Sequence, residues 1–453
     1  LERHNGGLMK RHIDLTEGSL SGHILRMTPP MTVGFLAMMA FNLSDAWFVS
    51  RMGTLPLAAI GYTFPLVMVF HSISMGIGLG AASCVSRAIG QGDHDKVNHL
   101  TTYSLLLTLL LMGLLAVIGE ASVSPVLRVM GATTPEIYEP AREYMRIWFI
   151  FAPFASLPMV GNNAIRSTGD TVRPGIVMAS GAILNIILDP IFIFGWHGVP
   201  AMGVPGAALA TGISRLLTLV LSFCLLRYRY RMLTFQWTGW TALFNAWRSI
   251  LFVAAPAAAT NLLQPITAGL VIRIIAGFGP MAVAATTAGQ RIEGFAYLIP
   301  MAMGTTLVPI IGQNWGAGRA DRVRCAWICT NWYGIIYSVA ILLVALFCAP
   351  QVAGLFSHDA QVVHLITMYL RILLTGAILL HSTVHTGFAF NAVEKPMHAA
   401  GLTAVRLVGF TLPMAWLGSR FAGVPGVYGG MALAYMFSGV VALLWFSRTL
   451  KKR

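Results

Sequence analysis

Long apolar stretches recur along the whole chain, separated by short polar segments rich in glycine, proline and arginine. Runs of roughly 20 apolar residues can cross the ~30 Å hydrocarbon core as helices, whereas a membrane β-barrel would alternate in segments of about 10. The pattern predicts an all-α membrane protein with twelve transmembrane spans. We expect them at about 28–49, 56–82, 100–120, 143–165, 174–194, 204–226, 249–272, 281–311, 326–349, 363–389, 397–418 and 424–446.

The composition agrees with this pattern and excludes several function classes. Of 453 residues, 56% are hydrophobic and 10% charged, against about 25% charged in soluble domains. The chain has no Walker, HExxH or GxSxG motif, so we expect neither an enzyme nor a bound cofactor. The net charge of +14 does not indicate nucleic acid, because no basic run is interleaved with aromatic residues.

The basic residues predict an orientation in the membrane. The N-terminus, the even-numbered loops and the C-terminus carry 20 Lys and Arg, whereas the odd-numbered loops carry 6. Because cytoplasmic loops are enriched in Lys and Arg, both termini are expected in the cytoplasm.

The two halves of the chain resemble each other. The segment GTLPLAAIG matches GPMAVAATT, and IGQGDHDKV matches WGAGRADRV, both at an offset of 226 (279 − 53 and 315 − 89); VPGAALA matches VPGVYGG at an offset of 220 (424 − 204). Parallel repeats of this kind occur in transporters, with the substrate site at the repeat interface. We predict a cytoplasmic segment 1–27, a lobe 28–226, a cytoplasmic connector 227–248, a lobe 249–446 and a cytoplasmic tail 447–453.

In the first half of the chain, two carboxylates lie deep within apolar runs of predicted spans, where charges are costly and usually functional. They are Asp45 in the first span and Asp189 in the fifth, and Asn185 shares a helix face with Asp189 at i,i+4. Pro190 removes the helical partner of the Ile186 carbonyl. These oxygens suit a proton or a hard cation such as Na⁺. The alternative is that Asn185 and Asp189 serve only as polar packing.

Other polar residues of the spans give weaker signals. The spacing of Pro29 and Pro30 allows either the start of the first helix or a bend within it. Asn42, Asn261 and Gln264 are candidate cavity residues. His381 and His385 form an i,i+4 pair without a third ligand, and the only acid within a span of the second half is Glu293. We therefore predict no metal site other than a Na⁺ site at Asp45 and Asp189.

Two stretches carry a resemblance to a known family. The stretch RSTGDTVRPGIVMASGAILNIILDPIFIFG with GVPGAALAT, and the stretch DAWFVSRMGTLPLAAIG, resemble the multidrug and toxic compound extrusion (MATE) transporters, particularly the DinF-like branch. The resemblance implies a V-shaped pair of six-helix lobes in a bacterial inner membrane. It implies an ion-coupling site at Asp45, Asn185, Asp189 and Thr211, and it favours a bend at Pro30. NorM-like relatives carry acids in the seventh and tenth spans. Here those regions hold Gln264, His381 and His385, so a cation site in the second lobe is not expected.

The expected function is export of lipophilic, mostly cationic drugs in exchange for H⁺ or Na⁺. Apart from drugs and membrane lipids we expect no partner, and the chain should act as a monomer. A flippase for lipid-linked precursors of the same superfamily is the alternative, although such proteins carry more cationic residues in the cavity. Coupling ion and substrate range are not readable from these residues.

Overall fold

The protein is described from a computed structural model that places residues 13–132, 134–196 and 198–451. The predicted segment 1–27 and the predicted tail 447–453 lie partly outside these residues. In chain order the helices are α2 (Leu20–Ser50), α3 (Thr54–Gly90), α4 (His94–Val129), α5 (Pro135–Arg166), α6 (Val172–Phe194), α7 (Val204–Cys224), η1 (Leu225–Arg229), α8 (Trp240–Ala276), α9 (Pro280–Ala296), α10 (Leu298–Gly316), α11 (Ala320–Gly354), α12 (Ala360–Ala392), α13 (Pro396–Ala404), η2 (Val405–Thr411) and α14 (Leu412–Lys451).

The predicted all-helical membrane fold is confirmed for the described part of the chain. Ten helical segments are long and apolar enough to cross a membrane, and the pair α9 and α10, bent by 47°, forms another. The longest segment, Pro396–Leu450, is interrupted by non-helical backbone at Ala422 and Gly423. Counting the two sides of this break separately gives the twelve predicted spans.

The helices extend beyond the predicted spans, and in two of them a capping side chain, not hydropathy, marks the beginning. Asp93 starts α4 by accepting from the Lys96 backbone N–H at 2.9 Å, and Asp359 caps α12 in the same way. Such side-chain acceptors satisfy N–H groups that have no helical partner. Helix α2 starts at Leu20 and contains Pro29 and Pro30, so the interpretation that these prolines mark the helix start is wrong.

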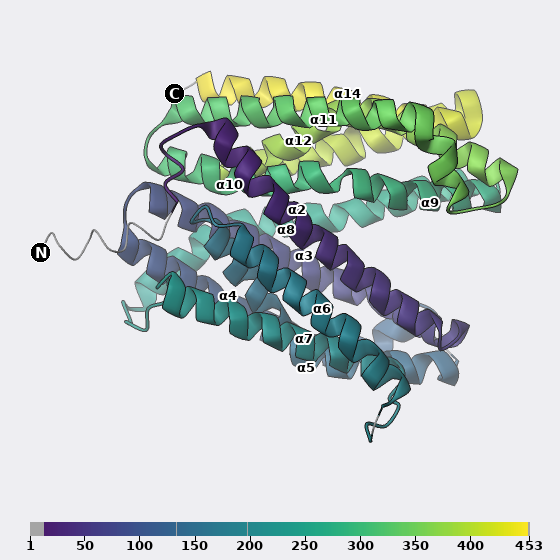
Figure 1. Ribbon diagram of the computed structural model, residues 1–453, viewed down its shortest axis with the longest axis horizontal. Coiled ribbons are helices and arrows are strands. Elements are labelled where there is room, and N and C mark those ends of the chain that lie inside the picture. The colour runs from purple at the N-terminus through teal and green to yellow at the C-terminus, as the bar shows by residue number, and fades with distance from the viewer. Residues whose placement is uncertain (1–12, 133, 197, 452–453) are drawn as a thin grey trace, which may run out of the picture. The chain divides into compact units, whose positions relative to one another are not determined.

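The described chain divides into two compact units, which we call the N-lobe and the C-lobe. The N-lobe comprises Pro29–Ala258 with residues 13–14, and the C-lobe comprises Leu15–Thr28 with residues 259–451. The division falls within α2 beside Pro29 and within α8 close to Pro256. Figure 1 traces this order of the helices along the chain.

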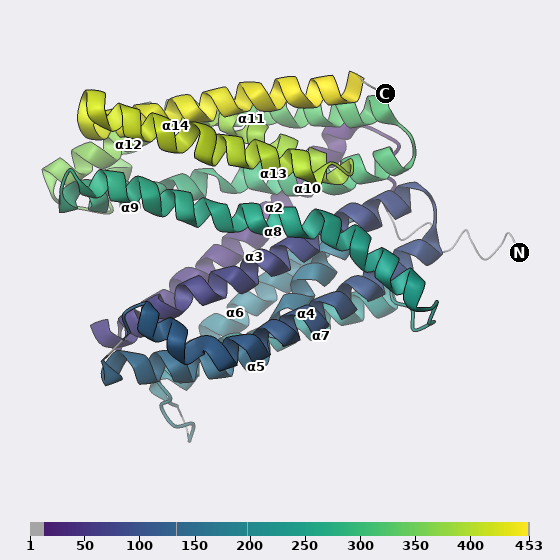
Figure 2. The ribbon, with the colours of Figure 1, turned by 180° about the vertical axis from the view of Figure 1, so that it is seen from behind.

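In the N-lobe, helix α5 packs against α3, α4 and α7, and α6 packs against α7 (Figure 2). Apolar side chains fill this lobe, among them Met112, Met145 and Phe149, all buried. The hydroxyls of Ser74 on α3 and Ser156 on α5 are 2.8 Å apart. Small residues let helices approach closely and polar side chains bond across them, as is usual within membranes.

In the C-lobe, helix α12 contacts α9, α10, α11, α13 and α14. It has the same central role as α5, and the offset of 226 carries the residue numbers of α5 onto those of α12, so the sequence repeat is also a repeat of helix packing. Tyr369 and Tyr428 form an edge-to-face pair with ring centroids 5.0 Å apart. The segment Leu15–Thr28 joins this lobe, and Asn314 donates to the Leu15 carbonyl at 3.0 Å.

Asp170 links the loop between α5 and α6 to the loop after η1. Its carboxylate accepts from the Tyr230 hydroxyl at 2.5 Å and from the Val172 backbone N–H at 2.9 Å, and it pairs with Arg173. Burial raises the pKa of Asp170, but the bonds from Tyr230 and Arg173 outweigh burial and hold this pKa below its ordinary value.

We therefore expect Asp170→Asn to lower the melting temperature of the detergent-solubilised protein at pH 7. Hydrogen bonds to a charged group are worth about 1.5–3 kcal/mol each. Since the folded-state pKa lies below the unfolded value of about 3.9, this contribution is complete above that value and is lost as pH falls through the folded pKa. The difference from wild type should therefore shrink in acid.

Asp95→Asn is the matched control, since Asp95 is exposed in the first turn of α4. Equal melting temperatures for Asp170→Asn and Asp95→Asn at pH 7 would contradict the structural role of Asp170.

Candidate functional site

A polar cluster lies inside the N-lobe, on helices that are otherwise apolar. Asn185 and Asp189 are fully buried on α6, and the Asn185 Nδ2 donates to Asp189 Oδ1 at 3.1 Å. The same nitrogen lies 3.5 Å from the Thr211 hydroxyl on α7. The predicted i,i+4 pair is therefore formed, and the structure adds Thr211 to it across the helix interface.

The Thr211 hydroxyl differs from most threonine hydroxyls of this protein. Thr28 and Thr101 donate to the carbonyl four residues earlier at 2.7 and 2.8 Å, the usual arrangement for threonine within membrane helices. Thr211 instead faces the side chain of Asn185. Its oxygen is therefore oriented toward the polar cluster.

Asp45 on α2 belongs to the same region of the N-lobe. Its charge acts on Asp189, and Tyr144 on α5 lies within electrostatic range of both carboxylates. Tyr144 and Asp189 are buried and Asp45 is half-buried, so water screens the interaction between these groups only in part. Sequence reasoning missed Tyr144, because nothing in its local sequence distinguishes it from an interfacial tyrosine.

Three oxygen atoms of the cluster have no hydrogen-bond partner among the described residues. They are Asp45 Oδ1, Asn185 Oδ1 and Asp189 Oδ2, each inaccessible from outside. Buried polar atoms are almost always paired, and an unpaired one requires an explanation such as an ion or a functional role. Carboxylate, amide and hydroxyl oxygens are the ligands that hard cations prefer, and a carboxylate can equally hold a proton.

Helix α2 passes close to α6 at Pro30. A Cβ added at Gly175 would lie 2.8 Å from the Pro30 carbonyl oxygen, and the neighbouring Gly34 faces Met178 and the Gly175 Cα. Only glycine permits this approach of the two backbones. Pro30 lies at this contact, and the helix that carries Asp45 there touches the helix that carries Asp189.

The remaining sequence candidates lie elsewhere. Asn42 is exposed on α2 and Asn261 is half-buried on α8, while Gln264 lines a pocket of the C-lobe. His381 contacts the Ser338 hydroxyl, and His385 contacts the Pro300 carbonyl at 3.0 Å. Within the described residues, no three His, Cys, Asp or Glu side chains could share a metal ion.

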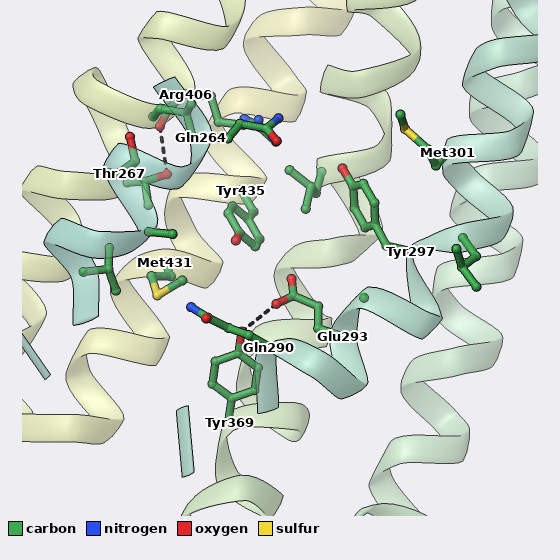
Figure 3. Close-up of a pocket in the computed structure, with 17 residues that line it drawn as sticks. Gln264, Thr267, Gln290, Glu293, Tyr297, Met301, Tyr369, Arg406, Met431 and Tyr435 are labelled. Atoms are coloured by element: carbon green, nitrogen blue, oxygen red, sulfur yellow. Dashed lines mark hydrogen bonds between the residues drawn. The ribbon is translucent and has the colours of Figure 1, made fainter. Parts of the chain in front are cut away.

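The pocket of the C-lobe has a volume of about 360 Å³ (Figure 3). Its polar lining includes Gln290, Glu293, Tyr297, Arg406 and Tyr435. The Tyr369 hydroxyl donates to Glu293 Oε2 at 2.5 Å. Sequence reasoning singled out Glu293 but missed Arg406, and it also missed Arg215 in the N-lobe. Both arginines interrupt apolar runs, so the cost of intramembrane charge could have revealed them.

The comparisons with known proteins agree with this fold and repeat. The family model described as MatE matches residues 30–191 and 256–417. The second match begins at an offset of 226 from the first (256 − 30), which is the offset of the repeat. The chain belongs to the MatE family of transporters.

Three relatives illustrate the range of the family. The chain is 33% identical over 432 residues to a protein named FAD transporter from Shewanella oneidensis, covering 95% of each chain. It is 24% identical to the multidrug export protein MepA of Staphylococcus saprophyticus, covering 93% of this chain and 92% of the other. A crystal structure of the Vibrio cholerae MATE transporter VcmN in the bent form superposes with a TM-score of 0.91 at 29% identity, covering 96% and 97% of the two chains.

These similarities confirm the predicted fold class, with two lobes of helices, and the predicted family. The chain is a multi-pass membrane transporter and, like its relatives, not an enzyme. The DinF-like branch stays a prediction.

We expect Gly175→Ala to slow transport by disturbing the contact between α2 and α6 at Pro30. The added methyl group would meet backbone and not a flexible side chain, and such overpacking typically costs 1–3 kcal/mol, so a cost of about that size is expected. Substrate efflux from proteoliposomes and the melting temperature measure the effect.

Gly113→Ala is the control, because a Cβ at Gly113 meets nothing within 4 Å. If both variants transport alike, the close approach at Gly175 has no role in transport.

Proposed function

We propose that this protein exports small organic molecules in exchange for H⁺ or Na⁺, using Asp45, Asn185, Asp189 and Thr211 as the ion-coupling site. The single observation that supports this is the set of three unpartnered oxygens of Asp45, Asn185 and Asp189. An unpaired carboxylate within a membrane is costly, so packing alone is a poor reason to keep two of them in one lobe.

The chemistry follows from the proximity of the two carboxylates. Like charges repel, so Asp45 and Asp189 bind a proton or a cation more readily together than either would alone. Uptake of the ion removes the negative charge that attracts a cationic substrate. Exchange results when ion and substrate stabilise different conformations, and Pro30 is the proposed point at which α2 changes shape. The distribution of Lys and Arg supports an orientation with both termini in the cytoplasm.

The first substrate class that we propose is lipophilic cations. The acids of the N-lobe support this class, and so do the names of relatives such as MepA and the probable multidrug resistance protein YoeA of Bacillus subtilis, which is 26% identical to this chain. Methionine side chains adapt to ligands of different shape, and Met38 and Met178 border a small cavity beside Arg215.

A flavin dinucleotide is a second candidate substrate. The relative named FAD transporter is 33% identical over almost the full length, whereas the relatives named for multidrug export that are cited above are 24–26% identical. Such a substrate is anionic and would not be attracted by Asp45 and Asp189. Its binding would require cationic groups elsewhere in the transporter.

The decisive experiment is efflux from proteoliposomes under an imposed pH gradient or an imposed Na⁺ gradient, with a fluorescent cation and with FAD as separate cargoes. Asp45→Asn and Asp189→Asn should each reduce gradient-driven efflux at least tenfold, because each removes a charge that the ion neutralises; tenfold corresponds to about 1.4 kcal/mol. The gradient that drives the wild-type protein identifies the ion.

Glu120→Gln serves as the matched control, since Glu120 is a half-buried acid that pairs with Arg146 and lies outside the cluster. If Asp45→Asn and Asp189→Asn insert normally and transport at the rate of Glu120→Gln, the proposed coupling site is refuted.

A further inference from the structure

Arg406 is a buried cation that forms no ion pair within the described part of the chain. Its side chain is 7% exposed, and within the described residues no carboxylate forms an ion pair with it and its Nε has no acceptor. Glu293 and the Tyr297 hydroxyl lie within electrostatic range of the guanidinium, yet the Tyr297 hydroxyl makes no hydrogen bond of good geometry. A buried guanidinium with unused donors is strongly unfavourable unless something pairs with it.

The backbone around Arg406 is also unusual. Arg406 lies in η2, a π-helical turn inside the rod formed by α13 and α14, and the Thr411 hydroxyl donates to the Arg406 carbonyl at 2.8 Å. A π-helical turn inserted into an α-helix is rare and is frequent at functional sites. Here the widened turn accompanies an arginine that lines the pocket of the C-lobe.

The pocket has the size and lining of a ligand site. Its volume of about 360 Å³ lies within the range of roughly 300–1,000 Å³ that is typical for small-molecule pockets. In Figure 3 the Tyr297 and Tyr435 side chains lie between those of Arg406 and Glu293. Tyr369 occupies one oxygen of Glu293, which leaves the other for a ligand donor. Among the described residues that line the pocket, the unsatisfied polar atoms are the Arg406 Nε, which only donates, and the Tyr297 hydroxyl, which can donate. The partner that fits both is an acceptor or an anion.

The repeat gives this pocket a counterpart. At the offset of 226, Asp45 corresponds to Val271 and Asn185 corresponds to Thr411; at the offset of 220, Thr211 corresponds to Met431. Val271, Thr411 and Met431 all line the pocket. The position that carries the acidic cluster in one half of the chain therefore carries a cavity with an unpaired arginine in the other half.

We propose that the C-lobe pocket binds an aromatic molecule through an anionic phosphate or carboxylate group, which Arg406 and Tyr297 hold. The tyrosine rings contact the aromatic part and Glu293 accepts from an N–H group of the ligand. This inference rests on the proposed function and identifies a substrate class for it, a soluble aromatic anion. Arginine suits this task, since its planar fork of donors matches both carboxylate and phosphate.

The test is equilibrium binding of flavin mononucleotide, an aromatic phosphate that is itself fluorescent, to the purified protein in detergent. Riboflavin, which lacks only the phosphate, is the comparison ligand. The wild-type protein should bind the phosphorylated compound about 10- to 100-fold more tightly, the ratio expected for charge-assisted hydrogen bonds. Equal affinities for the two flavins, or no binding of either, would overturn the proposal.

Two substitutions test whether Arg406 binds the phosphate group of the ligand. Arg406→Gln should abolish the preference for the phosphorylated flavin and leave riboflavin binding unchanged. Tyr297→Phe should reduce the preference for the phosphorylated flavin a few-fold. Arg371→Gln is the matched control, because Arg371 lies exposed on α12 and donates to the Leu346 carbonyl. Unchanged binding by Arg406→Gln refutes the assignment.

The melting temperature separates a binding role from a structural one. Because Arg406 forms no ion pair with any described residue, its neutralisation should not lower the melting temperature. If Arg406→Gln does not fold, Arg406→Lys and Tyr297→Phe test the proposal instead. Both variants keep the pocket, because the first removes only the planar fork of donors and the second removes only one hydroxyl. Full flavin phosphate affinity in both variants contradicts the proposal.

Lipid phosphate offers the same chemistry as a soluble phosphate. Nanodiscs of phosphatidylcholine alone and nanodiscs containing phosphatidylglycerol distinguish the two sources. Binding that is equal in both supports a soluble substrate. Displacement of the flavin by phosphatidylglycerol assigns the pocket to a lipid headgroup and overturns the proposed class.

Failure of this inference is distinguishable from failure of the coupling proposal. Flavin binding in detergent requires no gradient, and Asp45→Asn and Asp189→Asn should leave it unchanged. Loss of coupling at those acids with intact flavin binding refutes only the ion site. Normal coupling with no flavin binding refutes only the pocket.

Discussion

The interior of a membrane offers no water to polar groups, and this constraint determines which side chains of the protein carry information. Most hydroxyls within the helices satisfy themselves locally, as Thr28 does with the Ile24 carbonyl. A polar atom that stays unpaired there raises the free energy of the folded protein. The unpaired oxygens of Asp45 and Asp189 and the unpaired Nε of Arg406 are therefore costs that packing does not explain.

The two lobes use one scaffold for different chemistry. Helices α5 and α12 are equivalent in the repeat, and each contacts most of the other helices in its lobe. These central helices keep the packing alike while the polar lining diverges. In the N-lobe the lining is acidic, with an amide and a hydroxyl; in the C-lobe it combines Glu293, Arg406 and several tyrosines. Our proposals thus assign a cation site to one half of a repeated fold and an anion site to the other half.

Contacts within a single helix could be predicted from the sequence, whereas contacts between helices could not. The twelve spans follow from hydropathy, and the pair Asn185 and Asp189 follows from i,i+4 spacing. Both are local properties of the sequence. Tyr144 meets the carboxylates only through helix packing, which a single sequence does not encode in any local pattern. Arg406 was missed for another reason: a hydropathy window long enough to detect a span averages one arginine away. The sequence analysis did not identify the π-helical turn that contains Arg406. The attachment of Leu15–Thr28 to the C-lobe depends on side chains from a distant part of the chain, such as Asn314.

The contact of Pro30 with Gly175 gives the acidic cluster a mechanical connection. Asp45 follows Pro30 on α2, and Asp189 follows Gly175 on α6, so a bend of α2 at Pro30 changes the separation of the two carboxylates. Repulsion between like charges rises steeply as they approach in a medium of low dielectric constant. Neutralising one carboxylate therefore lowers the free energy of the conformation in which they are closest. In the proposed mechanism, a bend at Pro30 and ion binding at the acids are therefore linked within a single lobe, because each alters the free energy of the other.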